Sequence, residues 1–183
     1  MPQLRPRMTY ADLARLPDDG RRFELYDGEP FEVPMPTLRH QRVALHVATA
    51  LWGYEQQHGG RVVIAPFDVV LTLVDVVQPD VVYFAADRVP ALDESGPARI
   101  PPDLAVEVLS PGTAANDRGR KMRLLARFGV REYWLVDPVE NRLERYSLER
   151  GFYVLDGVAT SESTVTSRGL TGFTCPAAQI FSA

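Results

Sequence analysis

The chain has 183 residues, enough for one domain that buries roughly 70% of its extended surface on folding without disulfides or metal staples. Hydrophobic residues make up 45% of it and charged residues 24%, which excludes the disordered, collagen-like and coiled-coil classes. The 13 glycines and 15 prolines predict many turns rather than a helical bundle. Because Cys175 is the only cysteine and there are three histidines, an internal disulfide and a Cys/His zinc site are excluded.

Net charge and hydropathy bear on the cellular compartment of the protein and on the partners it can bind. The net charge of -4 argues against tight, general coating of nucleic acid but leaves room for a local basic patch. The most hydrophobic stretch, residues 69–77, is interrupted by Thr72 and Asp75, so it is too short and too polar to span a membrane. No apolar run has the length of a signal peptide core. We therefore expect a cytoplasmic protein without membrane attachment.

The N-terminal part, residues 9–33, predicts a short helix followed by a β-hairpin. Thr9 and Asp12 form a capping-box pattern, and Pro17 ends the helix. Residues 23–26 alternate in polarity, and Asp27 with Gly28 is typical of a hairpin turn.

The predicted core, residues 38–155, begins with a long helix and continues with β-rich segments. Apolar residues at helical spacing predict a helix over residues 38–57 that ends at Gly59. A second helix is predicted over residues 114–128. The predicted strands are residues 62–65, 67–74, 80–85, 104–109, 132–137, 143–147 and 152–155. The fold class is therefore α+β, a mixed sheet flanked by helices within a single domain, followed by a docked tail over residues 156–183.

Two acidic residues do not fit a purely structural interpretation. Glu107 lies inside an apolar run, on the same strand face as Ala105 and Leu109, and an unpaired buried carboxylate costs several kcal/mol. It therefore needs a partner, a metal or a cleft, unless its strand lies at an edge with one exposed position. Asp80 follows Pro79 and opens a β-run, where it is either a turn residue or a ligand.

A lysine on the second long helix is predicted to face the protein core rather than solvent. On a helical wheel Lys121 falls inside the arc of Leu124, Leu125 and Phe128, so we expect it to face the core. Asp117 lies in the same arc, four residues earlier, where it caps the helix or pairs with Lys121.

Arginines form a separate stripe on this helix, outside the apolar arc. Residues 116–131 contain six Lys or Arg and one Asp in a chain whose total charge is negative. The stripe is either a solvated face that favours the helix C-terminus or a surface for phosphates. Its candidate nucleic-acid contacts are Arg120, Arg123 and Arg127.

The combination of an acid opening one strand, an acid inside another and an inward lysine suggests a reaction. Two carboxylates supply hard oxygen ligands for Mg²⁺, which polarises a phosphoryl oxygen, and an ammonium stabilises developing negative charge. The residues Asp80, Glu107 and Lys121 therefore favour metal-assisted hydrolysis of a phosphodiester.

The order of motifs resembles the Uma-two family of endonucleases, part of the PD-(D/E)xK restriction-endonuclease-like superfamily. The motifs are FEL with Gly28, QPDVV at residues 78–82, VEVLSP at 106–111, Asp117 with Lys121, and GVREYWLVDP at 129–138. The resemblance implies a restriction-endonuclease-like core in which Asp80 and Glu107 bind the metal. The superfamily usually places its lysine two residues after the second acid, where this chain has Leu109. The family resemblance instead implies a lysine on the next helix, at Lys121.

The same resemblance adds two auxiliary positions, Glu24 in the hairpin and His40 near the start of the first long helix. Glu24 completes the site or is an exposed hairpin carboxylate. His40 is either a base or a hydrogen-bonding residue.

The leading hypothesis is an endonuclease that uses Mg²⁺, with Mn²⁺ as a substitute, and acts on DNA as a homodimer. Two alternatives remain open: a degenerate module that binds nucleic acid or protein without cleavage, and a hydrolase of a smaller phosphoester.

Overall fold

The computed structural model describes residues 7–182. Its N-terminal region forms the short helix and the β-hairpin that the sequence predicts. Helix α1 (Tyr10–Leu13) carries the capping box, in which Thr9 and Asp12 each bond the backbone of the other. Strands β1 (Arg22–Tyr26) and β2 (Glu29–Val33) pair antiparallel. Their turn has positive φ at both central residues, 54° at Asp27 and 77° at Gly28, which matches the twist of a tight hairpin.

A six-stranded main sheet forms the centre of the molecule, with strand order β10-β9-β8-β7-β6-β3. Its strands are β3 (Arg61–Ile64), β6 (Val81–Phe84), β7 (Leu104–Val108), β8 (Glu132–Asp137), β9 (Arg142–Glu149) and β10 (Phe152–Thr160). Only β7 and β8 are parallel, and the helical crossover between them accounts for that. The observed fold is α+β with a mixed sheet, as predicted.

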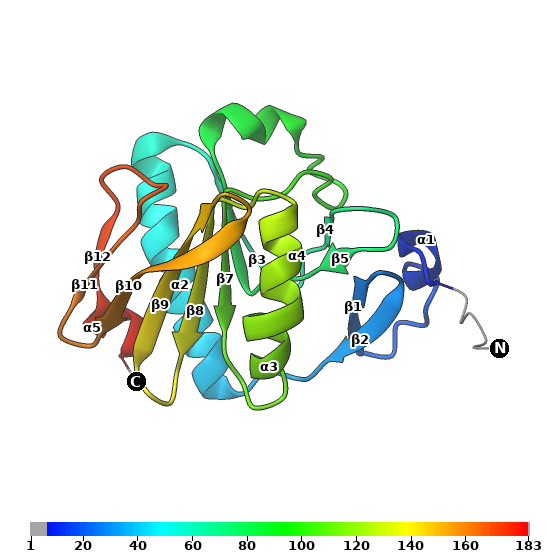
Figure 1. The fold of residues 1–183 in the computed structure, drawn as a ribbon, viewed down its shortest axis with the longest axis horizontal. Helices are drawn as coiled ribbons and strands as arrows, with labels where there is room; N and C mark the ends of the chain where they lie inside the picture. Colours follow the sequence, from blue (N-terminus) through cyan, green and yellow to red (C-terminus); the bar gives the residue numbers. More distant parts are fainter. Residues whose placement is uncertain (1–6, 183) are drawn as a thin grey trace.

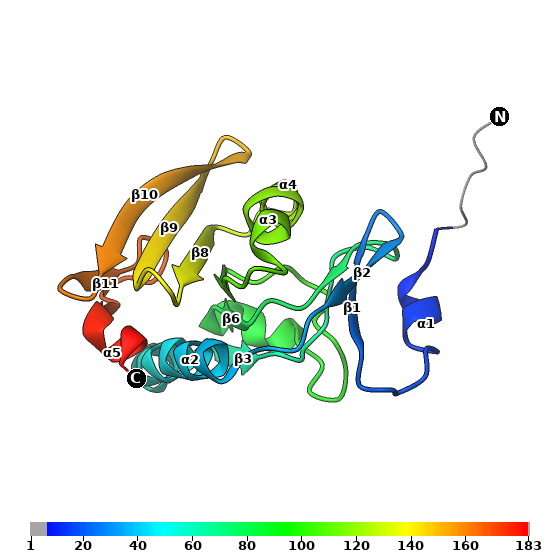
Figure 2. The ribbon, with the colours of Figure 1, turned by 90° about the horizontal axis from the view of Figure 1, so that it is seen from below.

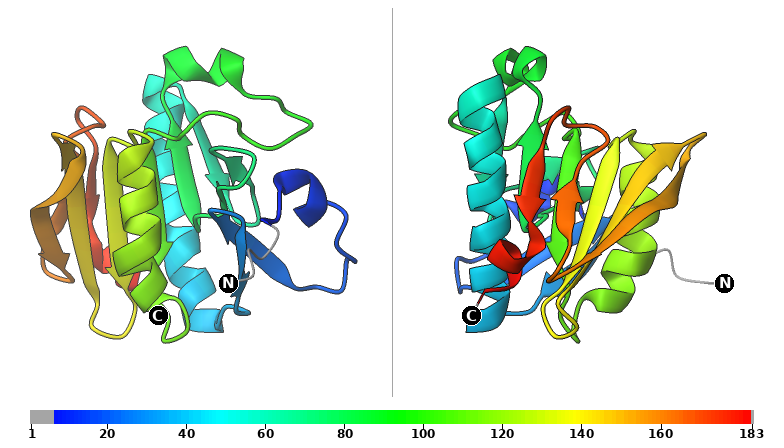
Figure 3. Two further views of the ribbon diagram at one scale, coloured as in Figure 1. Left: turned by 45° about the vertical axis from the view of Figure 1, so that its right-hand side comes forward. Right: turned by 90° about the vertical axis from the view of Figure 1, so that its left-hand side faces the viewer.

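Helices cover both faces of the main sheet, as the edge-on view in Figure 3 shows. Helix α2 (Leu38–His58) packs its apolar side, including Val43, Val47 and Leu51, on one face. The crossover helix lies on the other face (Figure 1). Its Leu124 and Leu125 belong to the buried cluster on that side, with Ala105 and Leu135 of the sheet. Helix α2 ends at Gly59, which adopts φ 74°, as the sequence predicts.

The crossover helix is continuous but contains a π turn that the sequence pattern does not reveal. It consists of α3 (Ala114–Asn116), the π turn η2 (Asp117–Lys121) and α4 (Met122–Arg127). A π turn shifts the helical hydrogen bonds by one residue and leaves a carbonyl without its α-helical partner. The buried hydroxyl of Tyr133 donates to the carbonyl of Asp117 at 3.1 Å and so satisfies one such group.

A small sheet, β2-β1-β5-β4, stands beside the main sheet (Figure 2) and corrects one prediction. The run 67–74 is not one strand, because only β4 (Val69–Val70) is extended and β5 (Val76–Val77) follows after a turn. The hydroxyl oxygen of Thr72 accepts hydrogen bonds from the backbone of Val74 and Asp75. This local bonding competes with a strand ladder and turns the chain.

The C-terminal segment is more regular than the docked tail that the sequence predicts. Strand β10 continues to Thr160, past a bulge between Leu155 and Gly157, and is followed by β11 (Thr164–Thr166), β12 (Thr174–Pro176) and α5 (Ala177–Phe181). The apolar anchors Leu170, Phe173, Ile180 and Phe181 are buried, as expected. The loop before β7 contains a 3₁₀ helix, η1 (Ala86–Ala91). Among the described residues, no helix is long and apolar enough to cross a membrane.

Candidate active site

The two predicted metal-binding acids lie at neighbouring strands of the main sheet, Asp80 directly before β6 and Glu107 within β7. Strands β6 and β7 pair antiparallel with Val81 opposite Val106, so the register continued by one residue sets Asp80 opposite Glu107. The backbone N–H of Val108 donates to Asp80 Oδ2 at 2.7 Å, which fixes that carboxylate at the head of β6. Glu107 is buried, whereas the side chain of Asp80 keeps 19% of its surface exposed. Asp80 therefore forms the open side of the site.

Lys121 faces the interior, as the helical wheel predicts, and joins the acids. Its Nζ lies 2.7 Å from Oε1 of Glu24 and 2.7 Å from Oε1 of Glu107. Asp117, one π turn earlier, lies 3.9 Å from the same nitrogen. All four side chains are almost fully buried. The lysine thus sits between the β-hairpin and strand β7 and supplies the positive charge for both.

Glu24 is buried at the candidate site and is not an exposed hairpin carboxylate. Its Oε1 accepts from the backbone N–H of Gln78 at 2.8 Å, and its Oε2 accepts from the Tyr26 hydroxyl at 2.6 Å. Tyr26 in turn accepts from Asn116 Nδ2 at 2.8 Å. Sequence reasoning missed these three supporting residues. The available signal for Tyr26 was its position two residues after Glu24, on the same strand face.

His40 lies at the site as a partner of Asp80. Its Nε2 is 3.2 Å from Asp80 Oδ2, and its side chain is largely buried at the start of α2. Burial alone lowers the pKa of His40, but the hydrogen bond and the charge of Asp80 outweigh it, so the pKa is raised. His40 therefore orients the carboxylate of Asp80 rather than standing free as a base.

The electrostatics of the buried group follow from its excess of acids. Burial raises the pKa of Glu107 well above its usual range, although Lys121 opposes the shift. Burial lowers the pKa of Lys121, but Glu107 and Glu24 outweigh it and raise that pKa well above its usual range.

Asp117 carries the clearest pH dependence in this group. Burial raises its pKa to about 6, against the charge of Lys121 and a hydrogen bond from Thr113. Because the folded-state pKa exceeds the unfolded one, the folded protein is favoured at low pH and loses that stability as the pH rises through about 6. We expect Asp117→Asn to be more stable relative to the parent at pH 7.5 than at pH 4, by up to about 3 kcal/mol.

Urea unfolding of both proteins at the two pH values measures this effect. The exposed Asp87→Asn is the control and should show the same difference from the parent at both pH values. A stability difference for Asp117→Asn that does not change with pH would contradict the assignment.

A small cavity of about 30 Å³ opens at these side chains, enough for a water molecule or an ion. We call it the acid cavity. Its polar lining includes Arg22, Glu24, His40, Gln78, Asp80, Glu107, Asp117 and Lys121. Within residues 7–182, three of its buried acceptor oxygens lack a hydrogen-bond donor: Gln78 Oε1, Glu107 Oε1 and Asp117 Oδ2. Lys121 lies close to Glu107 Oε1 but not along a hydrogen-bond direction. These oxygens leave the cavity suited to a cation.

The arginine stripe lies away from this cavity and is largely engaged. The guanidinium of Arg120 stacks 4.1 Å from the ring centre of Tyr26, and that of Arg127 pairs with Asp75 at 3.0 Å. Arg123 lines a cavity with both, and among the described residues its side chain forms no ion pair or hydrogen bond. Nucleic-acid contact by Arg120, Arg123 and Arg127 stays a prediction.

A much larger cavity, about 640 Å³, lies elsewhere, between α2 and the C-terminal segment. Its two histidines, His46 and His58, contact the backbone carbonyls of Ile180 and Tyr54. It has no acid in its lining, so size alone does not make it the candidate active site.

Comparison with known proteins identifies the family. The family model of Uma2, described as "Putative restriction endonuclease", matches residues 10–178. Among solved structures, a "putative nuclease belonging to DUF820" from Anabaena variabilis ATCC 29413 superposes with a TM-score of 0.76 at 20% sequence identity, covering 96% of this chain and 98% of that chain. A search of curated proteins found no match. The structural match shows a shared fold, the family match supports a nuclease function, and the chain belongs to the Uma2 family of restriction-endonuclease-like proteins.

Proposed function

We propose that this protein is a metal-dependent nuclease that hydrolyses phosphodiester bonds in DNA. The observation that carries the proposal is the meeting of Asp80, Glu107 and the buried ammonium of Lys121 at one cavity. Two further residues of that cavity, Gln78 and Asp117, each have a buried acceptor oxygen without a hydrogen-bond donor among the described residues, which supports a role beyond structure.

The donor set fits a divalent ion of the Mg²⁺ type. Among the described residues, no group of three or more His, Cys, Asp and Glu side chains is arranged around one point as a metal cage. Mg²⁺ does not need such a cage, because it keeps several waters and binds through one or two carboxylates. Asp80 and Glu107 are the residues that would hold it, with Mn²⁺ as a substitute. When bound, the ion supplies Lewis-acid polarisation of a phosphoryl oxygen and a more acidic water.

The chain's own groups have separate tasks in this proposal. The Nζ of Lys121, beside Glu107, stabilises the negative charge that develops on the phosphoryl group. Glu24 holds Lys121 in place, and Tyr26 holds Glu24. His40 keeps Asp80 oriented toward the cavity. These contacts fix the reactive groups before substrate arrives.

Cleavage assays on two substrates test the proposal. Supercoiled plasmid and bis(p-nitrophenyl) phosphate are incubated with the protein and MgCl₂, in parallel with EDTA, and Glu107→Gln is the inactive control. We expect nicking of the plasmid that requires Mg²⁺ and is lost in the variant. Turnover of the small phosphodiester alone would favour a hydrolase of smaller phosphoesters. Oligonucleotide binding without turnover of either substrate would favour a degenerate binding module.

We also expect a homodimer, because two sites related by a two-fold axis are the simplest way to cut both strands of a duplex. Sedimentation velocity at micromolar concentration measures the assembly. A single species with the mass of the monomer would contradict this expectation.

A further inference from the structure

A second cavity, of about 260 Å³, adjoins the acid cavity and shares Arg22, Pro36 and Asp80 with it. We call it the side groove. Its complete lining is Arg22, Pro36, Gln41, Ala44, Leu45, Ile64, Ala65 and Asp80. Because Asp80 belongs to both cavities, a molecule that occupies the side groove also reaches the open side of the candidate active site.

Arg22 is the cation of this groove. It opens β1, two residues before Glu24, so the strand period places both side chains on the same face. Within the part of the chain that the structure describes, the guanidinium of Arg22 forms no ion pair or hydrogen bond. This distinguishes it from Arg120 and Arg127, whose charges meet Glu29 and Asp75. Arg22 is therefore an available guanidinium in the lining of both the acid cavity and the side groove.

The far wall of the groove is apolar and exposed. Leu45 points outward from α2 and keeps 58% of its surface exposed, and Ile64 on β3 keeps 55%. Strand β3 is the edge of the main sheet, and Ile64 pairs with Val81, the residue after Asp80. Gln41, one helical turn before Leu45, adds an amide with both donor and acceptor groups. The sequence thus places two large apolar side chains and one amide next to the reactive acid.

We propose that the side groove binds the nucleotide next to the scissile phosphate, with Arg22 on a phosphate, Leu45 and Ile64 against the face of the base, and Gln41 at the edge of the base. This inference rests on the proposed nuclease function and defines its substrate more closely. A planar guanidinium and phosphate oxygens form two parallel hydrogen bonds, which explains an arginine at this position. The groove is smaller than the roughly 300–1,000 Å³ of typical drug-sized sites, which suits one nucleoside rather than a helix.

The apolar wall also selects the state of the nucleic acid. The faces of bases in a duplex are covered by their neighbours, so side chains such as Leu45 and Ile64 contact a base face only when the base is unstacked. The preferred substrate is therefore single-stranded DNA or a locally opened strand. A dimer is not required for this mode of binding.

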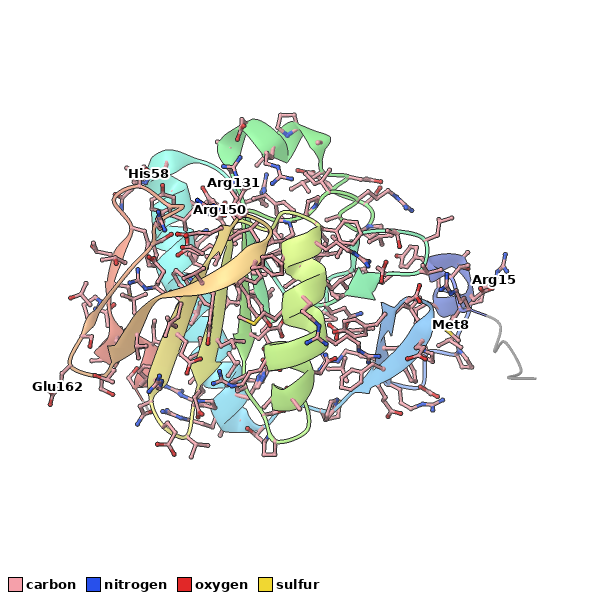
Figure 4. The ribbon with its side chains drawn as sticks, in the orientation of Figure 1. Met8, Arg15, His58, Arg131, Arg150 and Glu162 are labelled. Atoms are coloured by element: carbon pink, nitrogen blue, oxygen red, sulfur yellow. The ribbon has the colours of Figure 1, made fainter. Side chains whose placement is uncertain are left out.

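Equilibrium binding in EDTA tests the inference without relying on cleavage. The probes are a fluorescein-labelled 12-nucleotide oligothymidylate, an oligomer of the same length with abasic residues throughout, and a duplex of the same length. The variants are Arg22→Gln and Leu45→Ser. Their matched controls are Arg150→Gln, which removes a charge at the turn between β9 and β10 (Figure 4), and Leu38→Ser, which removes an exposed leucine of α2 outside the groove.

We expect oligothymidylate to bind more tightly than either the abasic oligomer or the duplex. Arg22→Gln should weaken both single strands about tenfold and reduce the salt slope by about one. Leu45→Ser should weaken oligothymidylate about four- to fifteenfold, the scale of one or two lost methylene burials, and leave the abasic oligomer unchanged. Both control variants should bind like the parent.

The outcomes separate this inference from the proposed function. Equal losses in Leu45→Ser and Leu38→Ser, or tighter binding of the duplex, would overturn the nucleotide site even if the protein cuts plasmid. The expected pattern of binding in a protein that cuts nothing would retain the nucleotide site and remove the nuclease activity. No binding of any probe by the parent protein would overturn the inference.

Discussion

Glu107→Gln is expected to abolish Mg²⁺ binding and reduce cleavage by about 10²-fold or more, without loss of folding stability. A ligand carboxylate is removed, and electrostatic groups at a reacting centre are worth about that factor or more. The fold tolerates the change because Lys121 keeps Glu24 as its partner at 2.7 Å. Glu107 adds a second buried negative charge to the single ammonium, so its removal can even stabilise the folded state.

Calorimetric titration with Mg²⁺ measures the metal affinity of Glu107→Gln, and urea unfolding measures its folding stability. Asp80→Asn should likewise lose Mg²⁺ affinity, since Asp80 is the second proposed ligand. Glu94→Gln removes an exposed acid that lines neither the acid cavity nor the side groove, and this control should change neither quantity. Unchanged Mg²⁺ affinity in both site variants would remove the metal assignment.

Lys121→Met is expected to reduce single-turnover cleavage of saturating DNA by about 10²-fold or more, while Mg²⁺ affinity changes far less. The structure adds a cost that the helical wheel did not predict. Glu24 and Glu107 would both lose the cation that lies 2.7 Å from each, and removing one partner of a buried ion pair costs about 3–5 kcal/mol. Slow cleavage by this variant alone would therefore not separate a catalytic role from a structural one.

A charge-balanced double variant makes that separation. Lys121→Met combined with Glu24→Gln removes the ammonium together with one of its acids, and should recover most of the lost stability. Glu24→Gln alone is the matched control. If the folded double variant cleaves much more slowly than Glu24→Gln, the ammonium acts on the reaction. Equal rates would make Lys121 a structural residue.

The sequence predicted the burial of the central residues of the candidate site because each depended on a local pattern. The apolar run around Glu107 and the helical arc around Lys121 both indicated buried charges, and both residues are buried. The helical wheel, drawn for an α-helix, placed Asp117 and Lys121 on one side, although the turn between them is a π turn. The placement holds because residues four apart lie on nearly the same side of an α-helix and of a π-helix. Glu24 and His40 came from family resemblance and lie at the same cavity.

The remaining features depend on contacts between distant segments, which a local pattern does not contain. Tyr26 reaches Asn116 across 90 residues, and the two meet only because the hairpin packs against the crossover helix. Arg120 and Arg127 looked like a free basic stripe, but the same hairpin and the turn before β5 bring Tyr26 and Asp75 to them. The predicted strand over residues 67–74 was wrong because the hydroxyl of Thr72 bonds the following backbone.

The ion pair between Glu24 and Lys121 also joins two layers of the molecule. Glu24 is carried by the small sheet, whereas Lys121 is carried by the crossover helix of the main sheet, and their carboxylate and ammonium meet at the seam between them. Before the hairpin docks, Lys121 therefore lacks its ion pair with Glu24, and the acid cavity lacks the residues that the hairpin contributes to its lining. We therefore expect docking of the N-terminal hairpin and completion of the acid cavity to be coupled, and protection of the β1 amides against hydrogen exchange would report on both.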